Sequence, residues 1–229
     1  NPPPEGTITW QEQRWRQGLA VAHKNSRFTA KVTRCPCLDP HWDDPRGVPI
    51  SAILFGGRRA DVAPLVCEAP TWERGVLAGA MISSEGEIAS EKKGLRHDPF
   101  AMTPFCGYHM GDYFEHWLSM AKRAPRGAHL LPKIYTVNWF RKGKDGDFLW
   151  PGFAENTRVL KWIADRVKGG GAAISTPIGN IPTPGALDLT GLSISQKNLQ
   201  AAMAVDRNKW WGEVAEAQRF FRDEIKKVP

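Results

Sequence analysis

The chain has 229 residues, a net charge of +7 and ten tryptophans, in a composition that is otherwise ordinary for a globular protein. It is long enough for one large domain, or two small ones, with a sizeable buried core. No run of about twenty apolar residues occurs, which excludes a transmembrane helix, and the scattered basic residues fit nucleotide, phosphate or carboxylate ligands as well as they fit nucleic acid.

The N-terminal part is expected to be poor in regular structure. Residues 1–24 are Pro-rich and then polar, and we expect an extended lead-in before a domain that spans residues 25–229. The first residues have neither a basic nor an apolar signal-peptide region, and the missing initiator methionine fits an excised piece. Residues 25–47, with prolines at 36, 40 and 45, are expected to form mainly loop.

The next segments alternate between strand and helix. The apolar run Ile50–Phe55, ended by two glycines, predicts a strand buried on both faces. A second strand is expected over Pro64–Ala69, followed by a helix that Thr71 caps and that runs to about Ala80. Residues 82–96 are highly charged and predict a mobile surface loop.

The second half begins with a helix over Tyr108–Lys122, with one apolar face made of Tyr113, Phe114, Trp117, Leu118 and Ala121. A strand is expected over Lys133–Trp139, with Phe148–Trp150 as its possible hairpin partner. A helix is expected over Asn156–Lys168, ended by three glycines. Its inward-facing side chains should be Val159, Leu160, Ile163 and Val167.

The remaining segments are a loop with prolines at 177, 182 and 184, a short helix that Ser195 caps and that runs to about Val205, and a final helix that carries Trp210, Trp211, Val214, Phe220, Phe221 and Ile225. No internal repeat occurs. Because strands and helices intermingle, the fold class is α/β (mixed α+β), with a mixed sheet flanked by helices.

The cysteines and histidines show no metal pattern. The four cysteines form no CxxC pair, and Cys35 and Cys37 are too close in sequence for an easy mutual disulfide. We therefore expect reduced thiols, a cytoplasmic location and no zinc site. His109 and His116 lie two turns apart on one helix, too far for chelation from adjacent turns.

The most informative segment is aromatic. Phe140, Phe148, Phe153 and Asn156 fall within seventeen positions, interrupted by the charged turn 141–147. Two aromatic faces can sandwich a flat heterocycle, each stack contributing about 1–3 kcal/mol, and an amide can bond to the edge of the base. Aromatic side chains between two strands are also common in a hydrophobic core, and both interpretations stay open on this ground alone.

Two arginines follow the first strand directly. Glycines let the backbone turn there, and Arg58 or Arg59 could bind phosphate or carboxylate oxygens at the strand end. The alternative is a turn with two solvated arginines. The short basic run Arg141–Lys144 is also expected to be a solvated turn.

Ordered sequence blocks point to a family. The segment VNWFRKGKDGDFLWPGFAENTRVLKWI resembles the guanine-binding segment of the GTP-dependent phosphoenolpyruvate carboxykinases. Further blocks agree with that family in the same order, from about Trp10 to the C-terminus: Asn25–Phe28, Gly47–Arg59, His97–Met102, Phe105–Met120 and Thr176–Pro182. The resemblance implies the C-terminal nucleotide-binding lobe of a much longer enzyme.

The resemblance also implies roles for individual residues. Phe140 and Phe153 would sandwich guanine, Phe148 would close the pocket, and Asn156 would contact the edge of the base. Arg58 would bind the transferring phosphoryl group as a catalytic residue. Further substrate and phosphate contacts would come from Asn25 and Arg27.

Other parts of the family pattern are altered or missing. Ser84 and Glu85 would begin an active-site lid. The stretch after them is more charged and shorter than in many relatives, so the contacts that would hold the lid closed are not predicted. No G-x-x-x-x-G-K-[ST] phosphate loop occurs. The ligands of Mn²⁺ or Mg²⁺ are expected upstream, so this chain is predicted to hold no metal site.

The expected function follows. The chain would be the C-terminal part of a GTP-dependent phosphoenolpyruvate carboxykinase, a decarboxylating lyase that converts oxaloacetate and GTP to phosphoenolpyruvate, GDP and CO₂ in gluconeogenesis. It would be inactive alone, and monomeric as the full-length enzyme, with guanine nucleotide but neither nucleic acid nor membrane as partner. The alternative is a non-catalytic module that kept guanine nucleotide binding and lost the chemistry.

Overall fold

The computed structural model describes residues 3–9, 11–20, 30–86, 94–124 and 130–229. Its contacts separate two compact units, one with Asn1–Pro49 and the other with Ile50–Gly86 and the C-terminal part to Pro229. In the described residues, the first unit contains the 3₁₀ turn Val32–Arg34 and a short bridge between Ile8 and Arg14. The expected end of the lead-in near residue 24 falls outside the described residues and stays a prediction.

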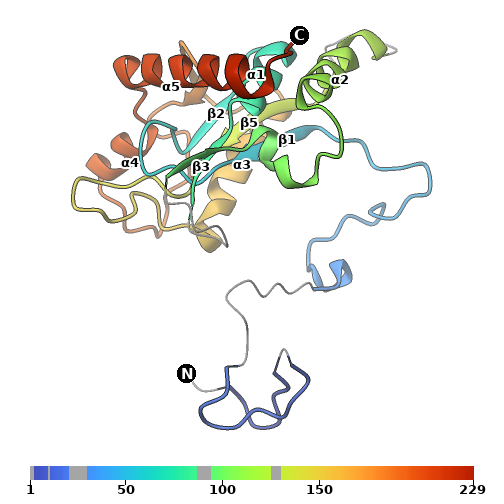
Figure 1. Ribbon diagram of the computed structural model, residues 1–229. Coiled ribbons are helices and arrows are strands. Elements are labelled where there is room, and N and C mark those ends of the chain that lie inside the picture. The colour runs from blue at the N-terminus through green and yellow to red at the C-terminus, as the bar shows by residue number, and fades with distance from the viewer. Residues whose placement is uncertain (1–2, 10, 21–29, 87–93, 125–129) are drawn as a thin grey trace. The chain divides into compact units, whose positions relative to one another are not determined.

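A five-stranded mixed sheet forms the centre of the second unit. In spatial order its strands are β1 (Ala52–Gly56), β5 (Lys133–Val137), β2 (Val66–Glu68), β7 (Gly179–Pro182) and β6 (Ala173–Thr176). β1 and β5 are parallel, and the other pairs are antiparallel. The predicted mixed sheet is therefore confirmed, with β1 and β6 at its edges (Figure 1).

Helices cover both faces of this sheet. In Figure 1, α1 (Trp72–Ala80), α2 (Met110–Arg123) and α5 (Arg207–Phe220) lie on one face, and α3 (Asn156–Val167) and α4 (Gln196–Met203) lie on the other. A π-helical turn, Phe221–Ile225, extends α5. None of the helices in the described part of the chain has the length and apolarity to span a bilayer.

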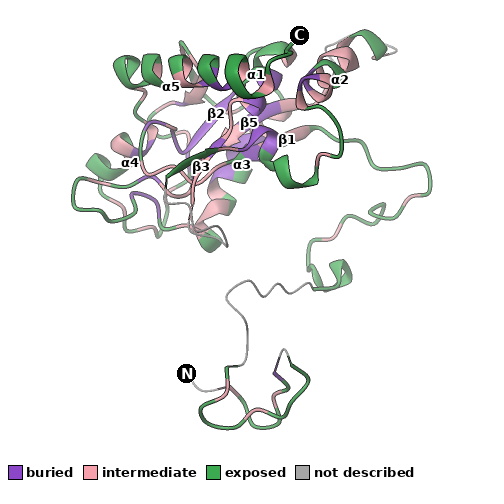
Figure 2. Ribbon diagram, viewed as in Figure 1, coloured by how far each residue is buried: buried purple, intermediate pink, exposed green. Residues whose placement is uncertain are grey.

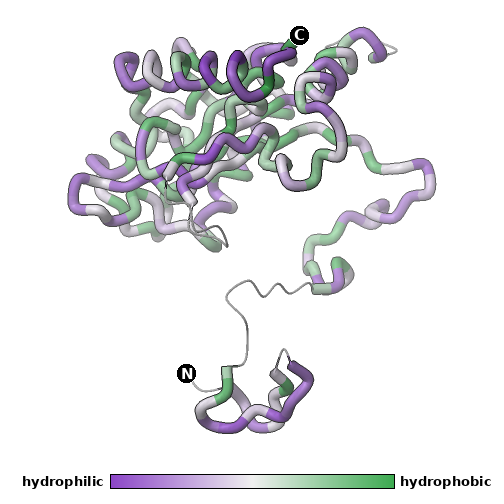
Figure 3. The backbone as a smooth tube through the Cα atoms, in the orientation of Figure 1, coloured by the Kyte–Doolittle hydropathy of each residue, from purple (hydrophilic) through white to green (hydrophobic). Residues whose placement is uncertain are grey.

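Two hydrophobic cores follow from the alternation of side chains along the strands. Ile53 and Phe55 of β1 pack with Phe114 of α2, whereas Leu54 packs on the opposite face with Trp162 of α3. Figure 2 shows the buried residues gathered on the sheet, and the backbone tube in Figure 3 is coloured as hydrophobic along much of the same region. β1 is thus covered on both faces, as its apolar run predicts.

Local capping signals place two helix starts correctly. The hydroxyl of Thr71 accepts a hydrogen bond from the backbone N–H of Arg74 at 3.2 Å, and the hydroxyl of Ser195 accepts one from Asn198 at 3.1 Å. Each bond satisfies one of the free N–H groups of a first helical turn. At the end of α3, Gly169 takes a φ of 86°, a conformation that glycine adopts without steric cost.

The first part of the segment with three prolines is not a loop, whereas Pro184 and the residues from it to Ser195 lie outside helices and strands. The first part forms the hairpin β6–β7, in which Pro177 lies in the turn and Pro182 ends β7. β6 is an edge strand, and edges and strand ends tolerate a residue that donates no ladder hydrogen bond. For this part the predicted loop was wrong, because Pro177 and Pro182 punctuate a hairpin.

Two further expectations about the second half are wrong. Phe148–Trp150 is not a hairpin partner of β5, since only one isolated bridge joins Lys142 to Phe148, and Trp150 is instead a core residue with 1% exposure. On α3, Leu160 is exposed and Trp162 is buried. Trp162 continues the inward row three residues after Val159, which has the same helical spacing.

The charged segment 82–96 begins and ends in regular structure. β3 (Ser83–Glu85) and β4 (Leu95–His97) form an antiparallel two-stranded sheet. Residues 87–93 between them lie outside the described residues. The expected surface loop therefore follows a pair of hydrogen-bonded strands. These strands lie next to the end of β1, because Glu85 donates its backbone N–H to the Arg58 carbonyl at 2.7 Å.

Candidate functional site

Two aromatic rings lie at the turn that follows β5. The rings of Phe140 and Phe148 are in edge-to-face contact, with centroids 6.0 Å apart and planes 72° apart. Phe148 is 56% exposed, and the ammonium of Lys142 lies 5.3 Å from the centre of its ring. The structure therefore brings together two of the three predicted clamp residues, in a position that a ligand can reach.

Phe153, the third predicted clamp residue, points into solvent. It is 94% exposed, and within the described residues no ring–ring contact joins it to Phe140 or Phe148. Its φ of 49° follows a φ of 76° at Gly152. A bulky residue in the left-handed region costs on the order of 1–3 kcal/mol, and such strain is concentrated at binding sites. The backbone thus holds an aromatic ring in water at a conformational cost.

Asn156 lies at the start of α3, where it is anchored by the core. The indole N–H of Trp150 donates a hydrogen bond to its side-chain oxygen at 2.9 Å. This bond fixes which end of the amide faces the core. The NH₂ group, with two N–H donors, remains for a ligand.

Arg58 lies beside the aromatic pair. Its guanidinium carbon is 5.0 Å from the centre of the Phe140 ring, within the range of a cation–π contact. Among the described residues no carboxylate lies within ion-pair distance of it. Its backbone is held on both sides, since its N–H donates to the Ser84 hydroxyl at 2.9 Å and its carbonyl accepts from Glu85. The geometry leaves its positive charge for an anionic ligand.

Arg59 has a different environment. Its guanidinium donates two hydrogen bonds to Glu213 of α5, at 2.5 and 2.8 Å, and one to the Ser83 hydroxyl at 2.6 Å. The side chain is only 12% exposed. Of the two arginines that the sequence left as alternatives, Arg59 is therefore a structural tie between the end of β1, β3 and α5.

Asn138 connects the two candidate subsites, and the sequence analysis assigned it no role. It is 2% exposed. Its side-chain oxygen accepts from the backbone N–H of Arg59 at 3.3 Å and of Phe140 at 3.1 Å. Its NH₂ group donates to the carbonyls of Arg59 at 2.9 Å and Ala63 at 3.0 Å. One amide thus uses all four bonding positions to join the arginine turn to the aromatic turn.

Ser84 and Glu85, the predicted start of a lid, make contacts with the same arginine turn. Beside the bond between Ser84 and Arg58, the Glu85 carboxylate accepts from the backbone N–H of Ala60 at 3.0 Å and lies 3.8 Å from Arg59. The remaining predicted substrate contacts, Asn25 and Arg27, lie outside the described residues, so their roles stay predictions.

The short basic run after Phe140 is not simply a solvated turn. Arg141 is buried, donates to the carbonyl of Ala204 at 2.6 Å and lies 3.8 Å from Asp61. Burial lowers its pKa from the usual arginine value. That expectation was wrong for Arg141, which packs the turn against the end of α4, because the backbone carbonyl offers its guanidinium a buried partner.

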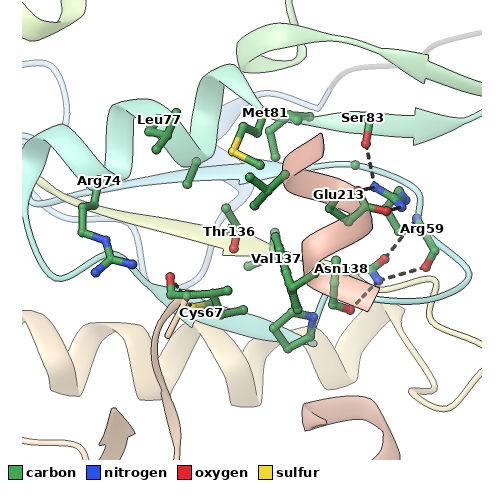
Figure 4. Close-up of a pocket in the computed structure, with 18 of the residues that line it drawn as sticks. Arg59, Cys67, Arg74, Leu77, Met81, Ser83, Thr136, Val137, Asn138 and Glu213 are labelled. Carbon is green, nitrogen blue, oxygen red and sulfur yellow. Dashed lines mark hydrogen bonds and ion pairs between the residues drawn. The ribbon is translucent and has the colours of Figure 1, made fainter. Parts of the chain in front are cut away.

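A separate cavity of about 220 Å³ lies between the sheet, α1 and α5 (Figure 4). Arg59, Asn138 and Glu213 line one side, and Leu77, Met81 and other apolar side chains line the rest. None of the predicted clamp residues borders it. It is smaller than the roughly 300–1,000 Å³ of most small-molecule sites.

Cys67, which also borders this cavity, is expected to have an unreactive thiol. Burial and the neighbouring Glu68 raise the pKa of its thiol to about 12. A thiol with so high a pKa carries almost no thiolate at neutral pH and is a poor nucleophile. In the described residues, no group of three or more His, Cys, Asp or Glu side chains could hold a metal ion.

Comparison with known proteins places this chain in a family. All 229 residues match the model described as "Phosphoenolpyruvate carboxykinase C-terminal P-loop domain". The chain therefore belongs to the GTP-dependent phosphoenolpyruvate carboxykinase family, as its sequence blocks predict.

Curated relatives agree with this assignment. The chain is 52% identical to a protein of Chlamydia caviae named phosphoenolpyruvate carboxykinase [GTP], over 222 residues that cover 95% of this chain and 36% of the relative. It is 49% identical to the bovine protein named phosphoenolpyruvate carboxykinase, cytosolic [GTP], over 95% of this chain and 35% of the relative. It thus spans little more than a third of the length of these relatives.

Proposed function

We propose that this chain forms the guanine-binding part of a carboxykinase that decarboxylates oxaloacetate and transfers the γ-phosphoryl group of GTP to the resulting enolate. The observation that carries the proposal is the arrangement of aromatic rings, a fixed amide and Arg58, which has no carboxylate partner among the described residues, in a chain of the GTP-dependent family. The finer assignment of residues to base and phosphate rests on the contacts described above.

Base recognition would combine stacking and one oriented amide. Phe140 and Phe153 would lie against the faces of guanine, and Phe148 would close the side of the pocket. Because Trp150 holds the oxygen of Asn156 toward the core, the amide would offer its NH₂ donors to the base. Guanine presents the acceptors O6 and N7, whereas adenine presents an amino donor at the position of O6. A donor-only contact therefore favours guanine.

Arg58 would face the phosphates of the nucleotide. Its backbone is fixed by Ser84 and Glu85, and its guanidinium is held beside Phe140. A guanidinium in this position would neutralise the charge that develops on the transferring phosphoryl group. Since the same backbone bonds connect it to β3, closure of a lid after Glu85 would act directly on the position of Arg58.

The family chemistry also uses divalent metals, Mn²⁺ or Mg²⁺, which when bound would neutralise negative charge on the nucleotide and the substrate. The described residues do not supply a fitting set of ligands. Likewise no Walker-type phosphate loop occurs in the sequence. We propose that both lie in the portion of the relatives that this chain does not cover.

The base preference is tested by calorimetry with GDP and ADP on the folded chain. The chain should bind GDP more tightly than ADP, because a site built for particular donors and acceptors rejects the base that leaves them unpaired. Asn156→Asp keeps the acceptor for Trp150 and replaces the donors by a second acceptor, so the preference should fall by about tenfold or reverse. Asn198→Asp, on the exposed face of α4, is the matched control. Equal affinities of the unmodified chain for GDP and ADP would reject the role of Asn156 and leave the stacking open.

The proposal that the metal and phosphate sites lie outside this chain is tested by measuring turnover. The isolated chain should form no phosphoenolpyruvate from oxaloacetate and GTP, even with Mn²⁺, because positioning and charge neutralisation supply most of phosphoryl-transfer catalysis. The measurement is GTP-dependent phosphoenolpyruvate formation, corrected for spontaneous decarboxylation. Turnover near that of a complete carboxykinase would show that the metal and phosphate sites lie within these 229 residues.

The alternative function is a non-catalytic guanine-nucleotide module derived from the family. It shares the base contacts and differs in the chemistry, so a longer polypeptide of the same gene decides between the two. If that polypeptide carries the phosphate loop and turns over, the enzyme is supported. We also propose a cytoplasmic location, on the name of the bovine relative, and a monomeric full-length enzyme.

A further inference from the structure

The sequence Cys35-Pro36-Cys37 folds into a turn that brings two thiols into contact. The backbone N–H of Leu38 donates to the carbonyl of Cys35 at 3.3 Å, which closes a four-residue turn with Pro36 at its second position. Proline is favoured there because its fixed φ fits the turn. The two sulfur atoms lie 3.6 Å apart, and both residues are exposed.

This geometry changes the expectation from sequence. Cysteines two positions apart are poorly placed for a mutual disulfide in an extended chain, although both side chains point to one side. The turn shortens the separation and brings the two sulfur atoms to 3.6 Å. The ring that a Cys35–Cys37 disulfide would close is small and exposed. Strained and exposed disulfides have the more oxidising reduction potentials and belong to the labile, regulatory class. A disulfide between Cys35 and Cys37 would therefore form and break reversibly and would not act as a permanent structural cross-link.

We propose that Cys35 and Cys37 are a redox-sensitive dithiol, a modification site that closes to an intramolecular disulfide by exchange with a small disulfide such as glutathione disulfide. The inference rests on the turn geometry and does not depend on the proposed nucleotide site.

The exchange runs in two steps. The thiolate of Cys35 attacks one sulfur of glutathione disulfide, forming a mixed disulfide and releasing one glutathione thiolate. Cys37 then loses its proton and attacks the Cys35 sulfur, which releases the second glutathione. In sum, two thiols and one glutathione disulfide become one intramolecular disulfide and two reduced glutathione molecules. The protein pair is oxidised, and the glutathione is reduced.

The contact between the sulfurs does not select one thiol as the first nucleophile, because either sulfur can be the donor in it. The same exchange can begin at Cys37 with the two roles reversed, and its products are the same. Pro36 between the two limits the backbone rearrangement that the second step requires.

The test uses the folded chain, equilibrated with glutathione buffers from reduced to oxidised, alkylated and digested with trypsin. Cleavage after Arg34 and Arg46 gives one peptide, residues 35–46, that contains both cysteines and no other. In oxidised buffer, its alkylated form should fall by about tenfold or more, with recovery in reduced buffer. A form without alkyl groups, two hydrogen atoms lighter than the dithiol peptide, should replace it. Cys35→Ser and Cys37→Ser should each carry a glutathione adduct instead.

Two controls make the test sharp. Cys106→Ser removes a cysteine elsewhere in the chain and should leave the peptide unchanged. A synthetic peptide of residues 35–46 lacks the rest of the first unit, and it should require about tenfold more oxidised buffer to close. The proposal is overturned if the peptide stays fully alkylatable after Cys106 has formed its glutathione adduct, if the bond links two chains, or if the synthetic peptide closes as readily as the protein.

Discussion

Two neighbouring regions differ in how far their polar and aromatic side chains are bonded within the protein or exposed to solvent. Around Asn138 and Arg59, every side-chain amide position is bonded, and the two terminal nitrogens of the guanidinium donate to Glu213 and Ser83. Around Phe148 and Phe153, large rings are exposed and the backbone is strained. The first region directs its polar groups mainly to protein partners, whereas the second exposes its rings to solvent.

The difference shows how the chain divides positioning from binding. Fully satisfied buried polar networks rigidify a structure. Asn138 supplies such a network between the turns that carry Arg58 and Phe140, and Trp150 supplies a similar anchor for Asn156. The ligand-facing groups can therefore stay unpaired because a neighbouring buried group fixes their place. Changes in the first region should cost stability, and changes in the second should cost affinity.

The largest effect is expected for Asn138→Ala. It leaves four buried backbone groups without their partner, at Arg59, Ala63 and Phe140, and each net hydrogen bond is worth about 1 kcal/mol. The free energy of unfolding should fall by about 3–4 kcal/mol, measured by urea denaturation. Asn198→Ala, on the exposed face of α4, should change it by less than about 0.5 kcal/mol. Equal effects of both variants would contradict the linking role of Asn138.

Glu213→Ala should have a smaller effect on the same quantity. It removes the main partner of a guanidinium that is nearly buried, and breaking such a pair costs more than the pair contributes. We expect a loss of about 2–3 kcal/mol, below the usual range for a broken buried pair because Ser83 and Glu85 still contact Arg59. Glu224→Ala, on the exposed π-helical turn, is the control. A loss no greater than that of the control would mean that Arg59 is held by the sheet alone.

For Phe153→Ala the comparison predicts the reverse pattern. The ring is exposed, so stability should change by less than about 0.5 kcal/mol, while GDP affinity should fall by about 1–3 kcal/mol through the lost stack. Phe105→Ala removes another highly exposed ring and should change neither quantity. Calorimetry and urea denaturation on the same samples separate the two effects. A large loss of stability with normal GDP binding would assign Phe153 to the core.

The smallest effects concern Cys67. Its folded pKa is about 12, above the ordinary 9.0, so protonation of the thiol stabilises the fold fully below pH 9, and this contribution is lost as the pH rises from 9 toward 12. At pH 8, iodoacetamide should alkylate Cys67 at least about 100-fold more slowly than the exposed Cys35 and Cys37. Mass spectrometry of timed samples checks the order. Comparable rates would show that Cys67 is accessible in the folded state.

Local signals predicted the helices well. The caps at Thr71 and Ser195 act over three residues, so they can be found in the sequence, and the apolar period of α2 places Phe114 in the core. The β6–β7 hairpin was missed because Pro177 and Pro182 look like loop residues until the pairing of the two strands places them in the turn and at the end of β7. The place of Trp150 was missed because its burial depends on α3, a segment that follows it.

The candidate site was predictable only in part. The exposed rings and Arg58 follow from ordered blocks of residues that resemble a family. Asn138 and Glu213 could not be assigned, since their partners lie 79 and 154 residues away in the sequence. An asparagine in a strand-to-turn segment looks the same whether it faces water or bonds four backbone groups. Only the tertiary packing of β1, β5 and α5 distinguishes the two.

The parallel pair β1 and β5 also sets a condition on how this chain folds. Their residues pair at a separation of about 80 positions, with α1, α2 and the strands β2, β3 and β4 between them. At about 5–20 residues per second of synthesis, β1 would wait roughly 4–16 s before its partner exists. During that time an apolar strand has an unpaired edge, which is a template for wrong pairing between chains. The centre of the sheet is therefore completed late, and expression at lower chain concentration should favour the soluble product.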